Sequence, residues 1–160
     1  MTLSPKLEAK FEKLLSSYPP GHQRSALIPM LLYAQDEIGS VTPELVEEVS
    51  KRVGVKPVEV DEVVTYYSML RKKPVGKHHI QICTNISCML SGSAELWDHA
   101  CSKLGIGNEE VTPDGQFSLE EVECIGACSW APALQAGYEF HHHVTPDAFD
   151  KLIDSLRKMH

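Results

Sequence analysis

The sequence lacks the features that mark membrane, nucleic-acid-binding and secreted proteins. No run approaches the roughly 18 apolar residues that a membrane-spanning helix requires. Lys and Arg number 15 against 22 Asp and Glu, and the formal net charge is −7. Because the few basic residues are scattered, we do not expect a nucleic-acid partner. The first residues, Met1 to Lys6, show neither an apolar signal core nor an Arg- and Ser-rich transit pattern. We therefore expect a protein of the reducing cytosol, where structural disulfides are rare.

Motifs for catalysis and nucleotide binding are also missing. The sequence has no glycine-rich loop that would cradle a phosphate, so we do not expect this chain to bind a nucleotide or flavin itself. It shows no Ser/His/Asp or Cys/His catalytic set, and the Cys-x2-Cys motif of thioredoxin-type redox proteins is absent. We therefore expect no catalytic residue in this chain.

Apolar periodicity predicts that the N-terminal part is helical. The prediction gives a helical domain at residues 1–72, with four helices over 4–18, 22–38, 42–53 and 57–67. None of these helices is long enough to be stable alone, so we expect them to pack as a bundle. The polar stretch at residues 71–77 marks the boundary with the rest of the chain.

The C-terminal part, residues 77–160, alternates strand-like and helical patterns. Its expected elements are a strand at 78–83, a helix at 94–104, hairpins around 113–115 and Gly137, and a final helix from Thr145. This order predicts a small α/β domain. The whole chain is therefore expected to be α+β, a helical bundle followed by an α/β domain.

Four of the five cysteines form two short clusters, Cys83-x4-Cys88 and Cys124-x3-Cys128. The fifth, Cys101, lies in a predicted helix and is expected to be a half-buried bystander. Each cluster follows a strand-like segment, so the two loops should meet at one end of a sheet. Converging thiolates select zinc, copper(I) or an iron–sulfur cluster. These spacings are wider than the Cys-x2-Cys knuckles of zinc sites and suit a two-iron cluster, but spacing alone leaves zinc open.

The residues around the cysteines resemble one known family. The chain looks like the thioredoxin-like [2Fe-2S] ferredoxin subunit of NADH-quinone oxidoreductase (respiratory complex I), a family with bacterial members and the 24 kDa subunit of mitochondria. The segments that carry the resemblance are 83–92, 123–128, 24–35, 63–69 and 113–119.

The resemblance implies that Cys83, Cys88, Cys124 and Cys128 bind one [2Fe-2S] cluster in a thioredoxin-like domain. It implies one-electron transfer, in which the cluster accepts single electrons from the reduced flavin of a partner. FMN and NADH would bind only to that flavoprotein subunit, on which the helical domain docks, and this chain alone would not oxidise NADH. Other peripheral-arm subunits would hold the complex at the inner face of the cell membrane, with no span from this chain.

Other functions remain open beside this one. The same module serves in soluble NAD-linked formate dehydrogenases and bidirectional hydrogenases, and neighbouring subunits alone would separate these complexes. A zinc-stabilised scaffold without redox activity is the rival from another class. A freestanding ferredoxin is disfavoured, because a soluble carrier does not need the helical extension at 1–72.

Two segments depart from the family pattern. Ser129 and Trp130 place a bulky indole beside the second cysteine cluster, and His141–His143 replace acidic or Asn residues. Alternate strand residues share a face, so His141 and His143 could reach one ion, but no other ligand completes a set and we expect an exposed strand end. We also expect His78 and His79 at a solvated edge. Pro132 precedes a core strand, and its peptide isomer is left open.

Overall fold

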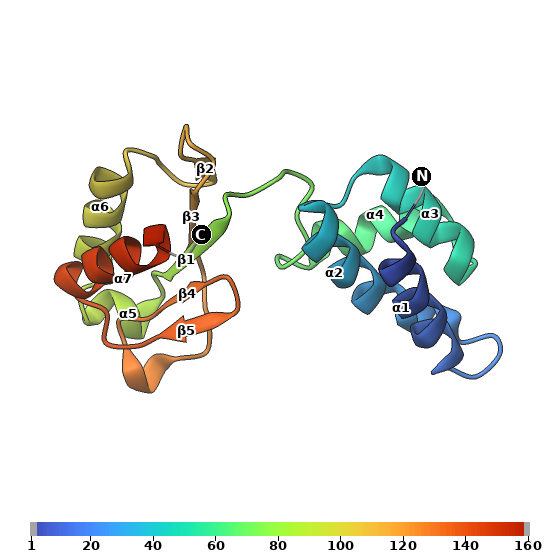
Figure 1. Cartoon of the computed structure of the whole chain (residues 1–160). Coiled ribbons are helices and arrows are strands. Elements are labelled where there is room, and N and C mark those ends of the chain that lie inside the picture. Colours follow the sequence, from blue (N-terminus) through green and yellow to red (C-terminus); the bar gives the residue numbers. More distant parts are fainter. Residues whose placement is uncertain (1–2, 159–160) are drawn as a thin grey trace. The chain divides into compact units, whose positions relative to one another are not determined.

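The chain folds into two compact units, the first ending at Pro74 and the second beginning at Val75. The structure is a computed structural model and describes residues 3–158. Figure 1 shows the helices of the first unit and the sheet with its covering helices in the second. Within residues 3–158, no helix combines the length and apolar character needed to cross a membrane.

The first unit consists of four α-helices. They are α1 (Pro5–Ser16), α2 (Leu27–Ile38), α3 (Pro43–Val53) and α4 (Pro57–Tyr66). Proline at the first position suits a helix start, because its missing N–H has no intrahelical acceptor there. The Ser4 hydroxyl accepts from the Leu7 N–H at 3.1 Å and caps α1. The second helix begins later than the sequence predicts, because Gln23–Ala26 form a 3₁₀ turn before it.

The four helices bury one apolar cluster, as a bundle requires. Its members with no exposed surface are Phe11, Ala26, Met30, Leu31, Ala34, Leu45, Val49 and Val60. Arg52 of α3 ties α1 to this core, since two of its guanidinium nitrogens donate to the Glu8 carboxylate at 2.6 and 2.7 Å. Its Nε also donates to Glu48 of the same helix at 2.7 Å. One arginine therefore binds two carboxylates and links α3 to α1.

The second unit is built on a five-stranded mixed sheet. The strand order is β2-β3-β1-β4-β5. At its centre β1 (His78–Cys83) runs parallel to β3 (Phe117–Val122), and β4 (Leu134–Ala136) lies antiparallel to β1. The edge strands β2 (Glu110–Val111) and β5 (Glu139–His141) close the two expected hairpins.

Two helices cover one face of this sheet. They are α6 (Ser93–Leu104) and α7 (Pro146–Lys158), and they lie together against the strands in Figure 1. Their apolar sides bury Ile80, Ile82, Leu96, Ala100, Phe117, Leu119, Leu134, Phe149 and Ile153. Cys101 packs against the edge of this cluster, half-buried as expected. The helical bundle followed by an α/β unit agrees with the α+β prediction.

The opposite face of the sheet carries a polar network that the sequence did not reveal. His79 is buried, which contradicts the expected solvated edge. Its Nδ1 lies 2.8 Å from the Ser118 hydroxyl and its Nε2 lies 2.8 Å from the Glu120 carboxylate. Because alternate residues of β1 and β3 face opposite sides, the apolar core on one side places these three residues together on the other. His78, by contrast, is half-buried, with its ring 5.5 Å from that of Phe117.

Candidate metal centre

Parallel pairing of β1 and β3 brings both cysteine pairs to one end of the sheet. Cys83 is the last residue of β1 and stands in register with Val122, the last residue of β3. The Thr84 N–H donates to the Val122 carbonyl at 3.2 Å, which holds the two departing loops together. Cys124 follows two residues after Val122. The convergence predicted from the sequence is therefore what the strand register produces.

A short helix between the first two cysteines positions Cys88. Helix α5 (Ile86–Leu90) begins after Asn85, whose side chain accepts from the Ile86 N–H at 2.7 Å. The sequence predicts a loop here, so helix α5 corrects that expectation. The signal was present, because Asn is a preferred residue just before a helix. Similarly, Cys128 lies in a 3₁₀ turn, η2 (Cys128–Trp130), and not in an open loop.

All four clustered cysteines line one cavity. Its volume is about 140 Å³, and its other lining residues are Asn85, Ile86, Ser87 and Ala127. Cys83 and Cys88 are buried, whereas Cys124 and Cys128 are exposed. The cavity therefore has an inner pair of thiols at its protein side and an outer pair at its solvent side. Cys101 does not line it.

The local electrostatics show how these thiols interact. Burial raises the pKa of the Cys88 thiol, and the neighbouring thiols of Cys83 and Cys128 raise it further, while a backbone hydrogen bond with Ala133 lowers it. The Cys83 thiol donates to the Glu123 carbonyl at 3.9 Å. With no cation beside it, a buried thiolate is costly, so the inner pair favours a bound metal that takes up the negative charge.

Backbone N–H groups supply part of that compensation. The Gly126 N–H donates to the Cys124 sulfur at 3.3 Å. Gly126 has a φ of +75°, a conformation that glycine adopts without steric cost. Hydrogen bonds of this kind stabilise anionic sulfur ligands.

These residues fit a two-iron cluster. The donors are soft thiols in two pairs, which suits a group in which each iron takes two sulfur ligands. Within residues 3–158, no group of three or more His, Cys, Asp or Glu side chains is arranged to hold a single metal ion. The cavity, the paired donors and the N–H group on Cys124 are the features that match the larger group.

The two departures from the expected family pattern contact each other. The Trp130 indole stacks on the His142 ring, with centroids 5.2 Å apart and planes 26° apart. The His143 N–H also donates to the Trp130 carbonyl at 2.9 Å. His142 and His143 are exposed, whereas His141 is half-buried and its Nε2 has no hydrogen-bond partner among residues 3–158.

The segment between η2 and β4 contains a cis peptide, which the sequence could not establish. It is the Ala131–Pro132 bond. The next residue, Ala133, is fully buried beside the inner cysteines. The Ala133 carbonyl accepts from the Cys83 N–H at 3.2 Å, which fixes this segment against the end of β1.

Comparison with known proteins places the chain in one family. The sequence model of the thioredoxin-like [2Fe-2S] ferredoxin matches residues 11–157. Subunit 2 of the NADH-quinone oxidoreductase of Thermus thermophilus is 43% identical over 147 residues, covering 91% of this chain and 81% of the relative. A NADH-quinone oxidoreductase subunit from Rhizobium meliloti is 41% identical over 157 residues, covering 98% of this chain and 90% of that relative.

A solved structure shares the fold at much lower identity. The NAD+-reducing [NiFe]-hydrogenase in its H2-reduced state superimposes with a TM-score of 0.69 at 20% identity. The match covers 82% of this chain and 23% of the hydrogenase chain. This likeness concerns the fold alone.

Proposed function

Because the chain belongs to the thioredoxin-like [2Fe-2S] ferredoxin family, we propose that it is the electron-transfer subunit of an NADH-quinone oxidoreductase. Its role there is to accept single electrons from the reduced flavin of a partner subunit. The observation that carries the proposal is that Cys83, Cys88, Cys124 and Cys128 line one and the same cavity.

These four cysteines hold the cluster, with an inner buried pair and an outer exposed pair. When bound, a [2Fe-2S] cluster supplies a site that takes up one electron. Cys83 and Cys88 exclude water from the inner side through their burial. The Gly126 N–H stabilises negative charge on the Cys124 sulfur. The outer pair, Cys124 and Cys128, faces the side from which electrons arrive.

The remaining parts of the complex belong to partners. FMN and NADH bind to the flavoprotein subunit, and this chain does not oxidise NADH by itself. The helical unit docks on that subunit, while other peripheral-arm subunits hold the assembly at the inner face of the cell membrane. The two-domain organisation expected at 1–72 and 77–160 gives each role its own folding unit.

Two alternative functions would use the same fold or the same thiols. The fold is shared with a hydrogenase that reduces NAD+, so the same module in a soluble hydrogenase or formate dehydrogenase is the nearer alternative. Similarity to named quinone oxidoreductase subunits, over 91% and 98% of this chain, favours the quinone complex. A zinc-stabilised scaffold uses the same thiols, since zinc also takes thiolate ligands.

The test is anaerobic purification followed by iron and sulfide assays and EPR before and after dithionite. We expect two irons and two sulfides per chain, no EPR signal when oxidised and an S = 1/2 signal when reduced. Stoichiometric zinc without sulfide, and no signal in either state, would reject electron transfer in favour of the scaffold. Copurification with a hydrogenase or formate dehydrogenase subunit would reassign the complex without removing the cluster.

A further inference from the structure

The turn that carries Cys128 is too short to hold its own conformation. It consists of the three residues of η2, and no side chain within residues 3–158 caps it with a hydrogen bond. Cys128 is also exposed at the solvent side of the cavity. Because a single 3₁₀ turn makes few internal hydrogen bonds, contacts from elsewhere in the chain must fix the position of its cysteine.

These contacts come from the loop between β5 and α7. The His143 N–H donates to the Trp130 carbonyl at 2.9 Å, and the Val144 N–H donates to the Pro132 carbonyl at 2.9 Å. The Trp130 indole also stacks on the His142 ring, with centroids 5.2 Å apart. Backbone and side-chain contacts therefore bind η2 and the residues after it to this loop.

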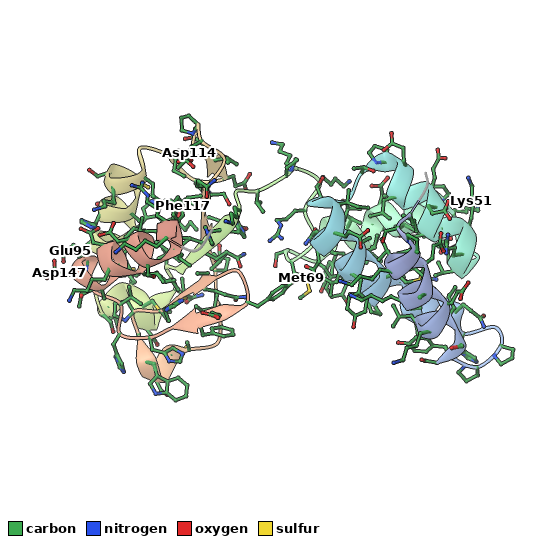
Figure 2. The ribbon with its side chains drawn as sticks, in the orientation of Figure 1. Lys51, Met69, Glu95, Asp114, Phe117 and Asp147 are labelled. Carbon is green, nitrogen blue, oxygen red and sulfur yellow. The ribbon has the colours of Figure 1, made fainter. Side chains whose placement is uncertain are left out.

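The loop is held at both of its ends, so it can act as a rigid support. At one end it leaves β5, which is paired with β4. At the other end Val144 is buried in the apolar cluster of this unit, whose member Phe117 is labelled in Figure 2. Between these ends His143 has a φ of +50°, a left-handed conformation that a residue other than glycine keeps only where its surroundings hold it.

We propose that His142 is a positioning residue for the iron–sulfur cluster. Its ring holds the Trp130 indole, and through the backbone of η2 this contact holds the Cys128 sulfur in place. The proposal rests on the proposed function, because Cys128 acts as a ligand only if the chain binds the cluster. The inner pair, Cys83 and Cys88, needs no such support, since the body of the unit buries both residues.

The experiment measures how fast a chelator removes iron from the anaerobically purified full-length chain, and how broad the EPR lines of the reduced protein are. An aromatic pair contributes enough to change an equilibrium constant about twofold to tenfold, so we expect His142→Ala to lose iron faster by about that factor. Its EPR lines should broaden, because a ligand without its support occupies a wider range of positions. His142→Phe keeps a flat ring for the indole and should restore both values.

His143→Gly is the matched control. It removes the exposed imidazole next to that of His142 but keeps the N–H that donates to the Trp130 carbonyl. Glycine also adopts the positive φ of this position without steric cost, so iron loss and line width should match the wild type. Equal effects of His142→Ala and His143→Gly would overturn the proposal, because they would point to the histidines as a group.

A double variant tests whether His142 acts through Trp130. Trp130→Ala should accelerate iron loss as His142→Ala does, and adding the second substitution to the first should have no further effect, because the stack is already lost. Fully additive effects would contradict a shared contact.

Hydrogen exchange of the metal-free chain examines the same contact without the cluster. Backbone N–H groups in residues 128–144 should exchange faster in His142→Ala than in the wild type, because the turn opens more often. A chain with two irons and two sulfides whose iron loss, EPR lines and exchange are unchanged by His142→Ala rejects this role and leaves electron transfer intact. A wild-type chain that takes up no iron or sulfide rejects the proposed function, and this role with it.

Discussion

Replacing Gly126 tests whether a backbone N–H tunes the cluster. Gly126 has a φ of +75°, and nothing lies within 4 Å of a Cβ built on it. A Cβ at position 126 therefore meets no clash, and the cost expected for Gly126→Val comes chiefly from the left-handed backbone. That cost is about 1–2 kcal/mol for an L-residue, with β-branched valine at the upper end.

The backbone can relieve this strain by leaving the left-handed region. The Gly126 N–H then turns away from the Cys124 sulfur, to which it donates at 3.3 Å. Loss of this donor destabilises the reduced cluster more than the oxidised one, because the reduced cluster carries one more negative charge. A differential loss of about 1 kcal/mol lowers the midpoint potential by about 40 mV, since about 1.4 kcal/mol corresponds to 59 mV for one electron.

The assay is a redox titration followed by EPR, with Gly137→Val as the matched control. Gly137 also has a positive φ, +59°, and open space around its Cβ, but it lies in the β4–β5 turn. We expect both variants to lose stability and only Gly126→Val to shift the midpoint. An unchanged midpoint in a Gly126→Val protein that keeps its iron and sulfide would refute the tuning argument. Gly126→Ala, which strains the backbone less, gives the same test if the valine variant does not fold.

Three further outcomes follow from residues already described. Cys124→Ser should abolish or strongly change the reduced EPR signal, whereas Cys101→Ser, outside the cavity, should leave iron and sulfide contents unchanged; equal losses would remove the assigned ligand set. Arg52→Met should destabilise the first unit by about 1 kcal/mol in urea unfolding, because α1 and α3 lose the Glu8–Arg52 ion pair that joins them, and an unchanged unfolding midpoint would disprove that role. The pKa of Asp150 is lowered chiefly by its hydrogen bond with His99, so its contribution to stability is present above about pH 4 and is lost as the pH falls below that. Denaturant unfolding at several pH values should show a steeper acid loss for the wild type than for His99→Gln, and parallel curves would contradict the linkage.

Helix and strand positions were predictable where periodicity was long and flanked by proline or glycine. The strand at His78–Cys83 and the helix ending at Leu104 lie where the sequence predicts, because apolar spacing and the Gly105 cap leave few alternatives. The five-residue helix α5 escaped prediction. It is too short to show a period, and it is fixed by the Asn85 cap and by the packing of Cys88.

The candidate site was likewise predictable from sequence only in part. The meeting of the two cysteine clusters was foreseeable from sequence, because Cys83 ends one strand and Cys124 comes two residues after the end of another. The difference between the buried and exposed pairs was not foreseeable, since it depends on which side of the cavity the rest of the unit covers. The contacts of His79 could not be predicted from sequence either. Its partners Ser118 and Glu120 belong to a strand about 40 residues later, and the contacts depend on how the two strands pair.

The exposure of the outer cysteines bears on the order in which cluster insertion and subunit assembly occur. Cys124 and Cys128 are the open side of the cavity, while Cys83 and Cys88 are closed off by the protein. Iron and sulfide therefore reach the cavity from the outer side, and a partner that covered Cys124 and Cys128 would shut that entrance. If a partner covers that side, cluster insertion has to come before assembly, and an apo chain captured too early would stay empty. Adding the flavin-bearing subunit before iron and sulfide should accordingly block cluster reconstitution, whereas the reverse order should not.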